Sequence, residues 1–353
     1  VMNKLISVIM PVYNTERYLE RSIGSLNDDL IQVIAVDDGS SDNSLDVLEE
    51  ISEKQKNVLV CKSDHKGASK ARQIGMSHVR TKYFGFADSD DRVRLNNYLK
   101  LCRVMDDNDF KIGNGRFTAY FPNSNIPLTD RKWNKDVISF SEDKIYLANC
   151  TCSLLDKIYH ADNLELLNQE SNQKVYEDME FVYYVLAKNG EMYHTNDSIY
   201  EYRMRGFENG STSAIGMNIL KSDGLKGLLS AGKSMYEKFK NAGLYEEYSE
   251  ELDSIMIRLI LQRIASIFNN NKIINKKEMA YHVIDILNTY LPNWQENKYY
   301  VQGFKGSSYY DYLFYIISKI DFFIYSMDKD YKTETPLDEK LKQYDKKIKV
   351  KKL

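Results

Sequence analysis

Pairs of carboxylates follow two apolar runs of strand length, and their spacing suits a divalent cation and a phosphate-bearing ligand. Asp88 and Asp90 follow the run Tyr83–Ala87, and Asp37 with Asp38 follows an earlier run. Side chains alternate along a strand, so Asp88 and Asp90 point to the same side and repel each other unless a cation lies between them. Mg²⁺ and Mn²⁺ suit such oxygen ligands, because they keep waters and complete their shell with phosphate oxygens. The alternative is turn chemistry, since Asp and Ser are common where strands end.

A second acidic cluster, in Val175–Phe181, opens a segment with helical spacing that runs to about Lys188. Glu177 and Asp178 lie in its expected first turn. A carboxylate at this place could act as a general base that takes a proton from an acceptor hydroxyl. Acids in the first turn of a helix also favour the helix dipole and need no other function. The residues alone leave both interpretations open.

The apolar pattern of the segments around these clusters predicts a parallel sheet whose strands are joined by crossover helices. Short continuous apolar runs separated by segments of helical spacing are typical of a sheet buried on both faces. Ligands bind such sheets outside the carboxyl ends of the strands, where Asp37 and Asp88 lie. The expected fold class is therefore α/β, with a Rossmann-like, mostly parallel sheet flanked by helices. The expected strands are Leu5–Met10, Ile31–Val36, Val58–Cys61 and Tyr83–Ala87, and the expected helices are Glu16–Leu26, Ser44–Ile51 and Ala68–Val79.

Two regions are expected in the chain, a mixed α/β body over 1–215 and a helical region over 216–353. Further strands are predicted at Arg116–Phe121, Glu191–His194 and Ile199–Arg203. After the stretch Gly206–Ser213, which is rich in Gly, Ser and Asn, the spacing is almost wholly helical. The last predicted helix, Tyr309–Met327, is rich in Tyr and precedes a Lys-rich tail. Packing on the body, assembly of copies and contact with a membrane surface are all compatible with it.

Composition and missing motifs exclude several classes of protein. The net charge of −3 over 353 residues gives no positive field that would attract nucleic acid. No stretch of about 20 residues is free of charges, so a membrane-spanning helix is not expected. Four scattered cysteines, of which only Cys150 and Cys152 are close, are typical of a reduced, cytosolic protein and form a poor zinc signature. No G-x-G-x-x-G follows a strand and no P-loop sequence occurs, so dinucleotide and P-loop sites lose support.

Four segments in a fixed order carry a resemblance that none of them carries alone. They are Pro11-Val12-Tyr13-Asn14 after the first expected strand, Val36–Ser40 at the end of the second, Gly67–Gly75 at the start of the third helix and Asp88-Ser89-Asp90 after the fourth strand. This order resembles the family 2 glycosyltransferases, inverting enzymes of the GT-A fold that use nucleotide-diphospho-sugars. The resemblance covers about residues 5–215 and extends to bacterial enzymes of cell-surface polysaccharide and teichoic-acid synthesis.

The resemblance implies how the donor nucleotide would be bound. Tyr13 would lie against the nucleobase, because its ring offers a flat apolar surface. Asp37 or Asp38 would accept a hydrogen bond from the imino N–H of the base, and the sequence does not say which. Arg72 would reach the base or a phosphate as a planar fork. The implied nucleotide-sugar-binding residues are Pro11, Val12, Tyr13, Asn14, Asp37, Asp38, Lys66, Gly67, Arg72, Asp88, Ser89, Asp90, Arg203, Arg205 and Ser213.

The resemblance also implies a divalent ion, Mn²⁺ or Mg²⁺, beside the diphosphate. Asp90 would be its direct ligand, and Asp88 would hold the ribose or a metal-bound water. Such a cation neutralises the diphosphate as it departs. Arg203 and Arg205 would clamp the phosphates from a stretch that reaches Ser213, where glycines suit a loop that moves.

In the family, an E-D pair before an aromatic residue carries the catalytic base, and Asp178 takes that position here. Glu177 would orient Asp178 or bind acceptor hydroxyls. Lys157 matches a family lysine that precedes an aromatic residue, and it could contact phosphate or acceptor. A surface lysine is ordinarily just solvated, so Lys157 carries little weight in this expectation.

The expected function is inverting, metal-dependent transfer of a sugar from a nucleotide-diphospho-sugar, with a UDP-sugar favoured by family frequency. The acceptor expected is a hydroxyl of a glycan or polyol phosphate, free or lipid-linked, in the cytoplasm or at the inner face of the cell membrane. The chain lacks the Q-x-x-R-W sequence, the signature of processive polysaccharide synthases that resemble this family. Its absence favours addition of a single sugar over processive synthesis. Two alternatives stay open: a nucleotidyltransferase that makes the sugar nucleotide, and a non-catalytic module that binds sugar nucleotides or glycans. Against the first, its usual Gly-rich N-terminal loop is replaced by Pro11–Asn14.

Overall fold

The computed structural model describes residues 4–120, 128–129, 132–167, 176–203, 222–269, 273–301 and 339. The chain divides into two compact units. The first unit comprises 1–142, 152–172 and 181–207, and the second comprises 143–151, 173–180 and 208–353. The boundary expected at 215 lies in 204–221, outside the described residues, so its position stays a prediction.

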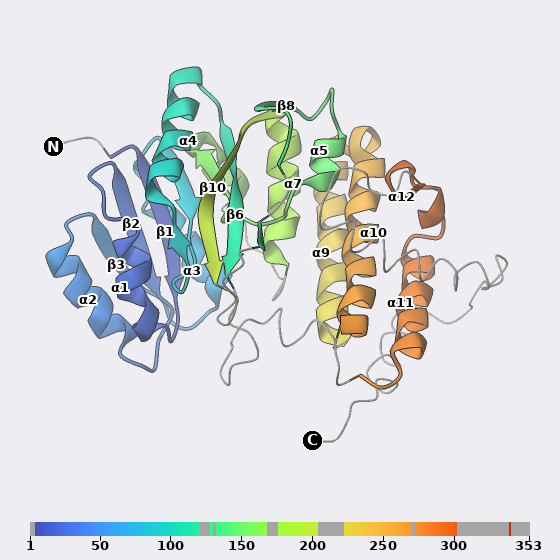
Figure 1. Cartoon of the computed structure of the whole chain (residues 1–353), viewed down its shortest axis with the longest axis horizontal. Coiled ribbons are helices and arrows are strands. Elements are labelled where there is room, and N and C mark those ends of the chain that lie inside the picture. Colours follow the sequence, from blue (N-terminus) through green and yellow to red (C-terminus); the bar gives the residue numbers. More distant parts are fainter. Residues whose placement is uncertain are drawn as a thin grey trace. The chain divides into compact units, whose positions relative to one another are not determined.

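The first unit is built on one sheet, to which the described residues contribute ten strands (Figure 1). The strand order is β3-β2-β1-β4-β9-β6-β10-β5, with β7 paired to β6 and β8 paired to β10. The strands are β1 (Ile6–Val12), β2 (Ile31–Asp37), β3 (Val58–Lys62), β4 (Tyr83–Phe86), β5 (Arg92–Val93), β6 (Ile112–Tyr120), β7 (Leu128–Thr129), β8 (Val137–Ser139), β9 (Lys157–His160) and β10 (Glu191–Arg203). Strands β3, β2, β1 and β4 run parallel, as do β6 and β10, which confirms the predicted α/β class.

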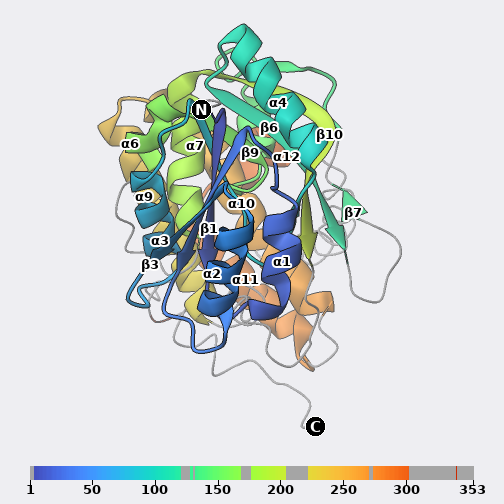
Figure 2. The ribbon, with the colours of Figure 1, turned by 90° about the vertical axis from the view of Figure 1, so that its left-hand side faces the viewer.

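Helices cover both faces of the parallel half of the sheet. Alternation along β1 sends Val8 and Met10 toward one face, where Leu19 of α1 belongs to the same buried cluster. The opposite face receives α3, which approaches so closely that a Cβ on Gly75 would collide with Ile9. Figure 2 shows α1 and α3 on opposite sides of β1. The helices of this half are α1 (Glu16–Gly24), α2 (Ser44–Lys54), α3 (Ala68–Ser77) and α4 (Leu95–Asn108).

The first unit also contains elements that were not expected, namely β5, β7, β8 and α4, and β6 begins at Ile112 rather than at Arg116. Two further differences concern β10 and β9. The separate strands expected at Glu191–His194 and Ile199–Arg203 form one strand, β10, whose pairing with β6 shifts register between them. The polar residues between the two apolar stretches break the alternation at that irregularity, which is why the sequence suggested two strands. Strand β9 was not expected, and it runs antiparallel between β4 and β6.

The second unit is helical, as expected for the C-terminal region. Its long helices are α9 (Ser222–Asn241), α10 (Tyr245–Asn269) and α11 (Lys276–Tyr290), and α10 packs against both of the others (Figure 1). Its shorter helices are α5 (Ile145–Asn149), η2 (Trp294–Glu296) and α12 (Lys298–Val301). The remaining helices are η1 (Ala161–Asn163) and α6 (Leu164–Leu167) in the first unit, and α7 (Glu177–Asn189), which begins in the second unit and continues in the first. The aromatic helix predicted at Tyr309–Met327 lies outside the described residues.

Two buried arginines of α10 explain why short segments distant in sequence belong to the second unit. Arg258 donates to the carbonyl of Cys150, and Arg263 donates to the hydroxyl of Tyr176 at 2.6 Å. A buried guanidinium must satisfy its donors, so it fixes the segments that carry the acceptors. Among the described helices, none combines the length and apolar character needed to cross a bilayer.

Gly85 of β4 offers a test of the packing that places the strand ends. A Cβ at this position would collide with the hydroxyl of Tyr98, whose side chain is fully buried. We therefore expect Gly85→Ala to lower the free energy of unfolding by about 1–3 kcal/mol, as overpacked cores do. Thermal unfolding measures the change, with Gly24→Ala as control because nothing lies within 4 Å of its added Cβ. Equal melting temperatures for the two variants would contradict close packing of Gly85 against Tyr98.

Candidate functional site

The loops after β1 and β2 are joined by the side chain of Asn14. Its Oδ1 accepts hydrogen bonds from the backbone N–H groups of Ser41 at 2.8 Å and Asp42 at 3.3 Å. Asn14 itself has φ 52°, a left-handed conformation that Asn tolerates better than most residues. This bridge fixes the chain just after Tyr13, whose ring stays 37% exposed at the end of β1.

Asp38 organises the loop that leads into α3. Its carboxylate accepts from the backbone N–H groups of Lys66 at 2.9 Å and Gly67 at 2.7 Å. The Nδ1 of His65 lies 3.1 Å from the Asp38 carbonyl, which can only accept, so Nδ1 carries the proton. The His65 ring lies on the Tyr13 ring, with centroids 4.5 Å apart. Tyr13, Asp38 and His65 thus form one small platform, and no sequence motif indicated that His65 belongs to it.

Asp37 differs from Asp38 in how its oxygens are used. One oxygen of Asp37 accepts from the backbone N–H of Ser40 at 3.2 Å. The other is buried and has no hydrogen-bond partner among the described residues. An unpaired buried carboxylate oxygen is costly unless a donor reaches it. Both aspartates are nearly fully buried, and each oxygen of Asp38 already accepts from a backbone N–H, whereas Asp37 keeps one oxygen without a partner among the described residues.

Some matched residues act through the backbone rather than through their side chains. Pro11 and Val12 are buried in β1, and the Val12 carbonyl accepts from the Asp38 N–H at 2.8 Å. Lys66 is exposed and meets Asp38 through its N–H. Gly67 precedes α3 with φ 91°, a conformation that requires glycine. The backbone of these residues shapes the loops at the site, and their contact with a nucleotide sugar stays a prediction.

The acidic turn, Asp88–Asp91, follows β4 and lies beside β1. Arg72 of α3 forms an ion pair with Asp88, with Nη2 and Oδ1 3.2 Å apart. Ser89 is buried and accepts from the hydroxyl of Thr15, which follows β1. Parallel pairing of β1 with β2 and β4 therefore brings the Tyr13 platform and the acidic turn to one edge of the sheet.

Asp91 is the buried centre of this turn and was missed in the sequence. Its carboxylate accepts from the Tyr200 hydroxyl at 3.0 Å and from the backbone N–H of Arg203 at 2.7 Å. The same Tyr200 oxygen accepts from the N–H of Asp88 at 2.9 Å. Burial, and then the charges of Asp88 and Asp90, raise the pKa of Asp91 to about 8. Its place directly after Asp90 was the available signal, whereas nothing in the sequence pointed to Tyr200.

The donor set of the acidic turn suits Mg²⁺ or Mn²⁺ only when a ligand completes the shell. Within the described ranges, no group of three or more His, Cys, Asp or Glu side chains is arranged to hold a metal ion. Asp88 and Asp90 supply carboxylate oxygens, and burial, together with the charges of these two residues, raises the pKa of Asp91 beside them. Hard cations bound through one or two carboxylates take their other ligands from water and phosphate. The residues present fit such a substrate-completed site.

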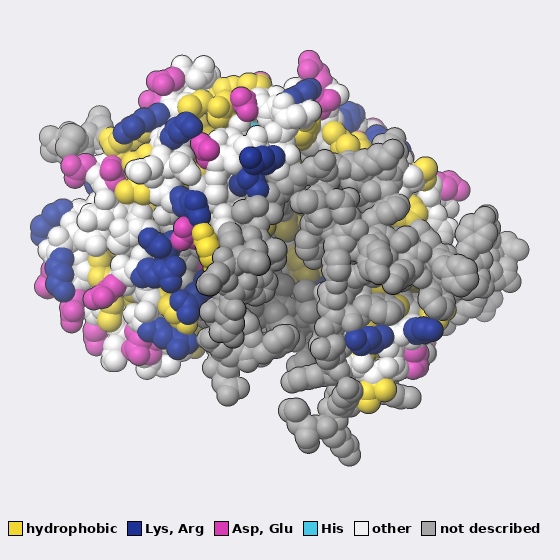
Figure 3. Space-filling model, viewed as in Figure 1, with side chains coloured by type: hydrophobic (Ala, Val, Ile, Leu, Met, Phe, Trp, Pro, Cys, Tyr) yellow, Lys and Arg dark blue, Asp and Glu magenta, His cyan; other side chains and the backbone are white. Residues whose placement is uncertain are grey.

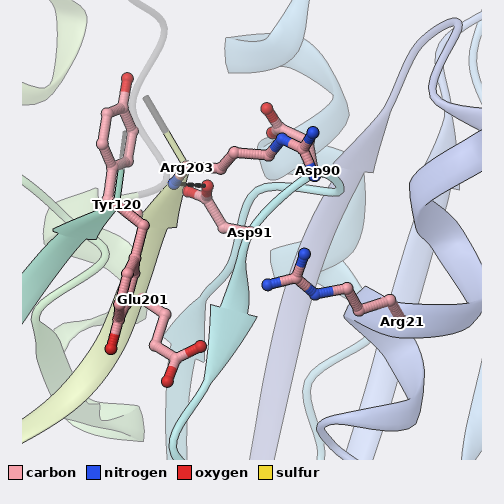
Figure 4. A pocket seen from close by; sticks show the side chains of 7 residues that line it. Arg21, Asp90, Asp91, Tyr120, Glu201 and Arg203 are labelled. Atoms are coloured by element: carbon pink, nitrogen blue, oxygen red, sulfur yellow. Dashed lines mark hydrogen bonds between the residues drawn. The ribbon is translucent and has the colours of Figure 1, made fainter. Parts of the chain in front are cut away.

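A cavity of about 260 Å³ lies beside the acidic turn. It is lined by Arg21, Asp90, Asp91, Tyr120, Glu201, Tyr202 and Arg203. Figure 4 shows Arg21 reaching toward the turn from α1 and Arg203 reaching toward it from the end of β10. The Arg203 guanidinium also lies over the Tyr18 ring, 4.8 Å from its centroid. The cavity therefore joins the predicted residues Asp90 and Arg203 to Arg21, which the sequence did not single out.

In the second unit, the start of α7 is held by contacts on both sides of Asp178. Tyr176 accepts from Arg263 and has φ 63°, so the chain turns sharply there. Glu180 is buried and lies 3.7 Å from the Nζ of Lys238 on α9. Asp178 lies in the first turn between these anchors and is partly exposed. Glu177 is the first residue of α7.

Other expected residues are placed differently or are not described. Lys157 is fully buried rather than solvated, and its Nζ lies 2.7 Å from Asp156 and donates to the Ser153 carbonyl. An ion pair of this kind serves the interior of the first unit rather than a ligand in solvent. Arg205 and Ser213 lie outside the described residues, so their assignments stay predictions.

Comparison with known proteins identifies the family of this arrangement. Residues 7–163 match the model of glycosyl transferase family 2. The minor teichoic acid biosynthesis protein GgaB of Bacillus subtilis (strain 168) is 25% identical over 244 residues, which cover 67% of this chain and 27% of that protein. The chain spans less than half the length of the first curated relatives it matches.

Two solved structures share the fold. Residues 1–349 of S. aureus TarS in complex with UDP-GlcNAc align with TM-score 0.51 and 18% identity, covering 85% of this chain and 92% of that one. The mannosyltransferase PcManGT from Pyrobaculum calidifontis, in complex with GDP-Man and Mn²⁺, aligns with TM-score 0.50 and 10% identity, covering 93% and 89%. The sheet, the order of motifs and the model match agree over the matched part of the chain: residues 7–163 carry a family 2 glycosyltransferase domain, and the fold is GT-A.

Proposed function

We propose that the protein is an inverting, metal-dependent glycosyltransferase that takes a sugar from a nucleotide-diphospho-sugar. One observation carries the proposal. The platform of Tyr13, Asp38 and His65 lies in one row with the acidic turn, along the carboxyl ends of β2, β1 and β4. A ring platform suits a base, and clustered carboxylates suit a cation bound to a diphosphate. UDP is the favoured nucleotide, since one fold relative was solved with UDP-GlcNAc.

The residues of the first unit have defined parts in donor binding. Tyr13 stacks on the base, and Asp37 or Asp38 accepts from its imino N–H. Arg72, held by Asp88, and Arg203, held through its N–H by Asp91, provide positive charge on either side of the acidic turn. Bound Mg²⁺ or Mn²⁺ would be held by Asp90 and Asp88 and would neutralise negative charge on the leaving diphosphate.

Asp178 is the proposed general base. Removal of the acceptor proton requires a carboxylate that is accessible yet fixed in position. The anchors at Tyr176 and Glu180 fix the backbone on both sides of Asp178, and its side chain is partly exposed. The acceptor is proposed to be a hydroxyl of a cell-surface glycan or polyol phosphate, in line with the teichoic acid role in the name of GgaB.

A thermal-shift screen of nucleotide sugars, with and without Mn²⁺, tests the proposal directly. A ligand that binds only the folded state raises the melting temperature by mass action. We expect a UDP-sugar to stabilise the protein more with Mn²⁺ than with EDTA, and release of UDP in the presence of acceptor to follow. Formation of pyrophosphate from UTP and a sugar phosphate would instead support the nucleotidyltransferase alternative.

The platform predicts that the Tyr13 ring contributes to UDP affinity. Stacking of a base on an aromatic side chain contributes ~1–3 kcal/mol, so Tyr13→Ala should weaken UDP binding by about tenfold or more. Calorimetric titration measures the affinity, and Tyr13→Phe serves as control because it keeps the ring. If the alanine variant binds UDP as the wild type does, the base lies elsewhere.

The acidic turn predicts that Asp90 couples UDP binding to the cation. Asp90→Ala should bind UDP in Mn²⁺ no more tightly than the wild type does in EDTA, because the direct ligand is gone. The same titration with Asp46→Ala, an exposed acid on α2, controls for loss of one negative charge. An Asp90 variant that still binds UDP more tightly with Mn²⁺ would remove the proposed metal role.

The position of Asp178 predicts a defect in transfer rather than in donor binding. Asp178→Asn should keep UDP affinity within about twofold and lower the turnover number by about 10²-fold or more, since the amide cannot accept the proton. Glu246→Gln is the matched control, because Glu246 is also an acid in the first turn of a helix. Normal turnover in the Asp178 variant would show that its charge only favours the helix dipole.

A further inference from the structure

Arg21 lines the cavity beside the acidic turn and has no assigned role in donor binding or catalysis. It projects from α1 toward the turn that holds Asp91 (Figure 4). Among the described residues, no carboxylate or other acceptor pairs with its guanidinium. An arginine that is available in a cavity is a ready partner for an anion, because its planar fork can donate two parallel hydrogen bonds.

Arg203 supplies a second guanidinium to the same cavity from the other side. Its backbone is fixed by the hydrogen bond to Asp91, and its guanidinium rests over the Tyr18 ring without an ion pair to any described carboxylate. The ring leaves the edge of the guanidinium, where its N–H donors lie, available for hydrogen bonds. The cavity thus has cationic donors on two sides.

The carboxylate of Glu201 does not neutralise these donors, because other arginines already pair with it. Its oxygens lie 3.1 Å from the Nε of Arg94 and 3.5 Å from the Nη1 of Arg92. Arg92 and Arg94 together with Arg21 and Arg203 make four guanidinium groups, against three carboxylates in the cavity lining. Positive charge therefore exceeds negative charge there even when every carboxylate is ionised. Dark blue side chains are frequent on the part of the surface in Figure 3 that carries α1.

The size of the cavity limits what it can hold. Sites for drug-sized ligands measure about 300–1,000 Å³, and this cavity is smaller, at about 260 Å³. It suits one phosphate group with a few attached atoms rather than a whole sugar nucleotide. The hydroxyl of Tyr120, which accepts from Arg94 at 2.7 Å, adds a polar wall for the ester or hydroxyl oxygens of such a group.

We propose that this cavity is a phosphate subsite, in which Arg21 and Arg203 together bind one phosphate group of a substrate. The proposal rests on the proposed function, because Asp90 lines the cavity and is also the residue that would hold the cation. The phosphate has two chemical sources, the donor diphosphate and a phosphate ester of the acceptor. Both present the same tetrahedral anion to the two arginines, and binding experiments separate them.

The test compares the full chain with its Arg21→Gln and Arg17→Gln variants. Arg17 lies one turn earlier on α1 and also contacts the Tyr18 ring, but it does not line the cavity, so its variant controls for lost charge. Affinity for UDP with Mg²⁺ is measured by calorimetry. Affinity for glycerol 3-phosphate, with and without saturating UDP, is measured by ligand-observed phosphorus NMR, with glycerol as the uncharged probe.

The expected result is that Arg21→Gln weakens phosphate binding by about tenfold, the usual effect of losing a hydrogen bond between charged groups, while Arg17→Gln does not. Loss confined to glycerol 3-phosphate assigns the subsite to the acceptor, and loss of UDP affinity assigns it to the donor. If Arg21→Gln binds both probes as the wild type does, or if glycerol binds as well as its phosphate, the subsite is refuted. If wild type fails to bind UDP, the proposed function fails, and glycerol 3-phosphate still decides the subsite.

Discussion

The arrangement of the candidate site in the first unit depends on the contacts that hold Asp88, Asp90 and Asp91 close together in the turn after β4. Asp91 is almost fully buried, and its two hydrogen bonds come from Tyr200 and Arg203, residues more than a hundred positions away in the chain. Those bonds join the end of β4 to the end of β10 across the intervening strands. The acidic turn is thus held by the strand that also carries Arg203, so the charge of the turn and the arginine beside it are positioned together.

The arginines around this turn differ in their partners among the described residues. Arg72 pairs with Asp88 on the side of α3, whereas Arg21 and Arg203 approach from α1 and β10 and pair with no carboxylate in the part of the chain that the structure describes. Arginines that are already paired stabilise the turn in the absence of ligand. Arginines that pair with no described carboxylate are available to an anion, which is the basis for the proposed phosphate subsite.

In the second unit, side-chain contacts fix a partly exposed acid, Asp178, at the start of a helix. The first turn of α7 is held from α10 through Arg263 and Tyr176, and from α9 through Lys238 and Glu180. Helix termini normally fray, and two side-chain anchors within five residues oppose that. Asp178 therefore has a defined backbone position although nothing in its own sequence neighbourhood would enforce one.

Local sequence determined those features that depend on neighbouring residues alone. Apolar runs and helical spacing gave β1 to β4 and α1 to α3, and the ordered motifs located Tyr13, Asp38, Arg72 and Asp90, because a strand end and the loop after it are adjacent in the chain. Only the tertiary structure decided that His65 lies on Tyr13, that Lys157 is buried, and that Tyr200, Arg203 and Arg21 meet the acidic turn. Those contacts join residues from separate elements, and which elements meet depends on strand order and register, for which hydrophobic periodicity carries no signal.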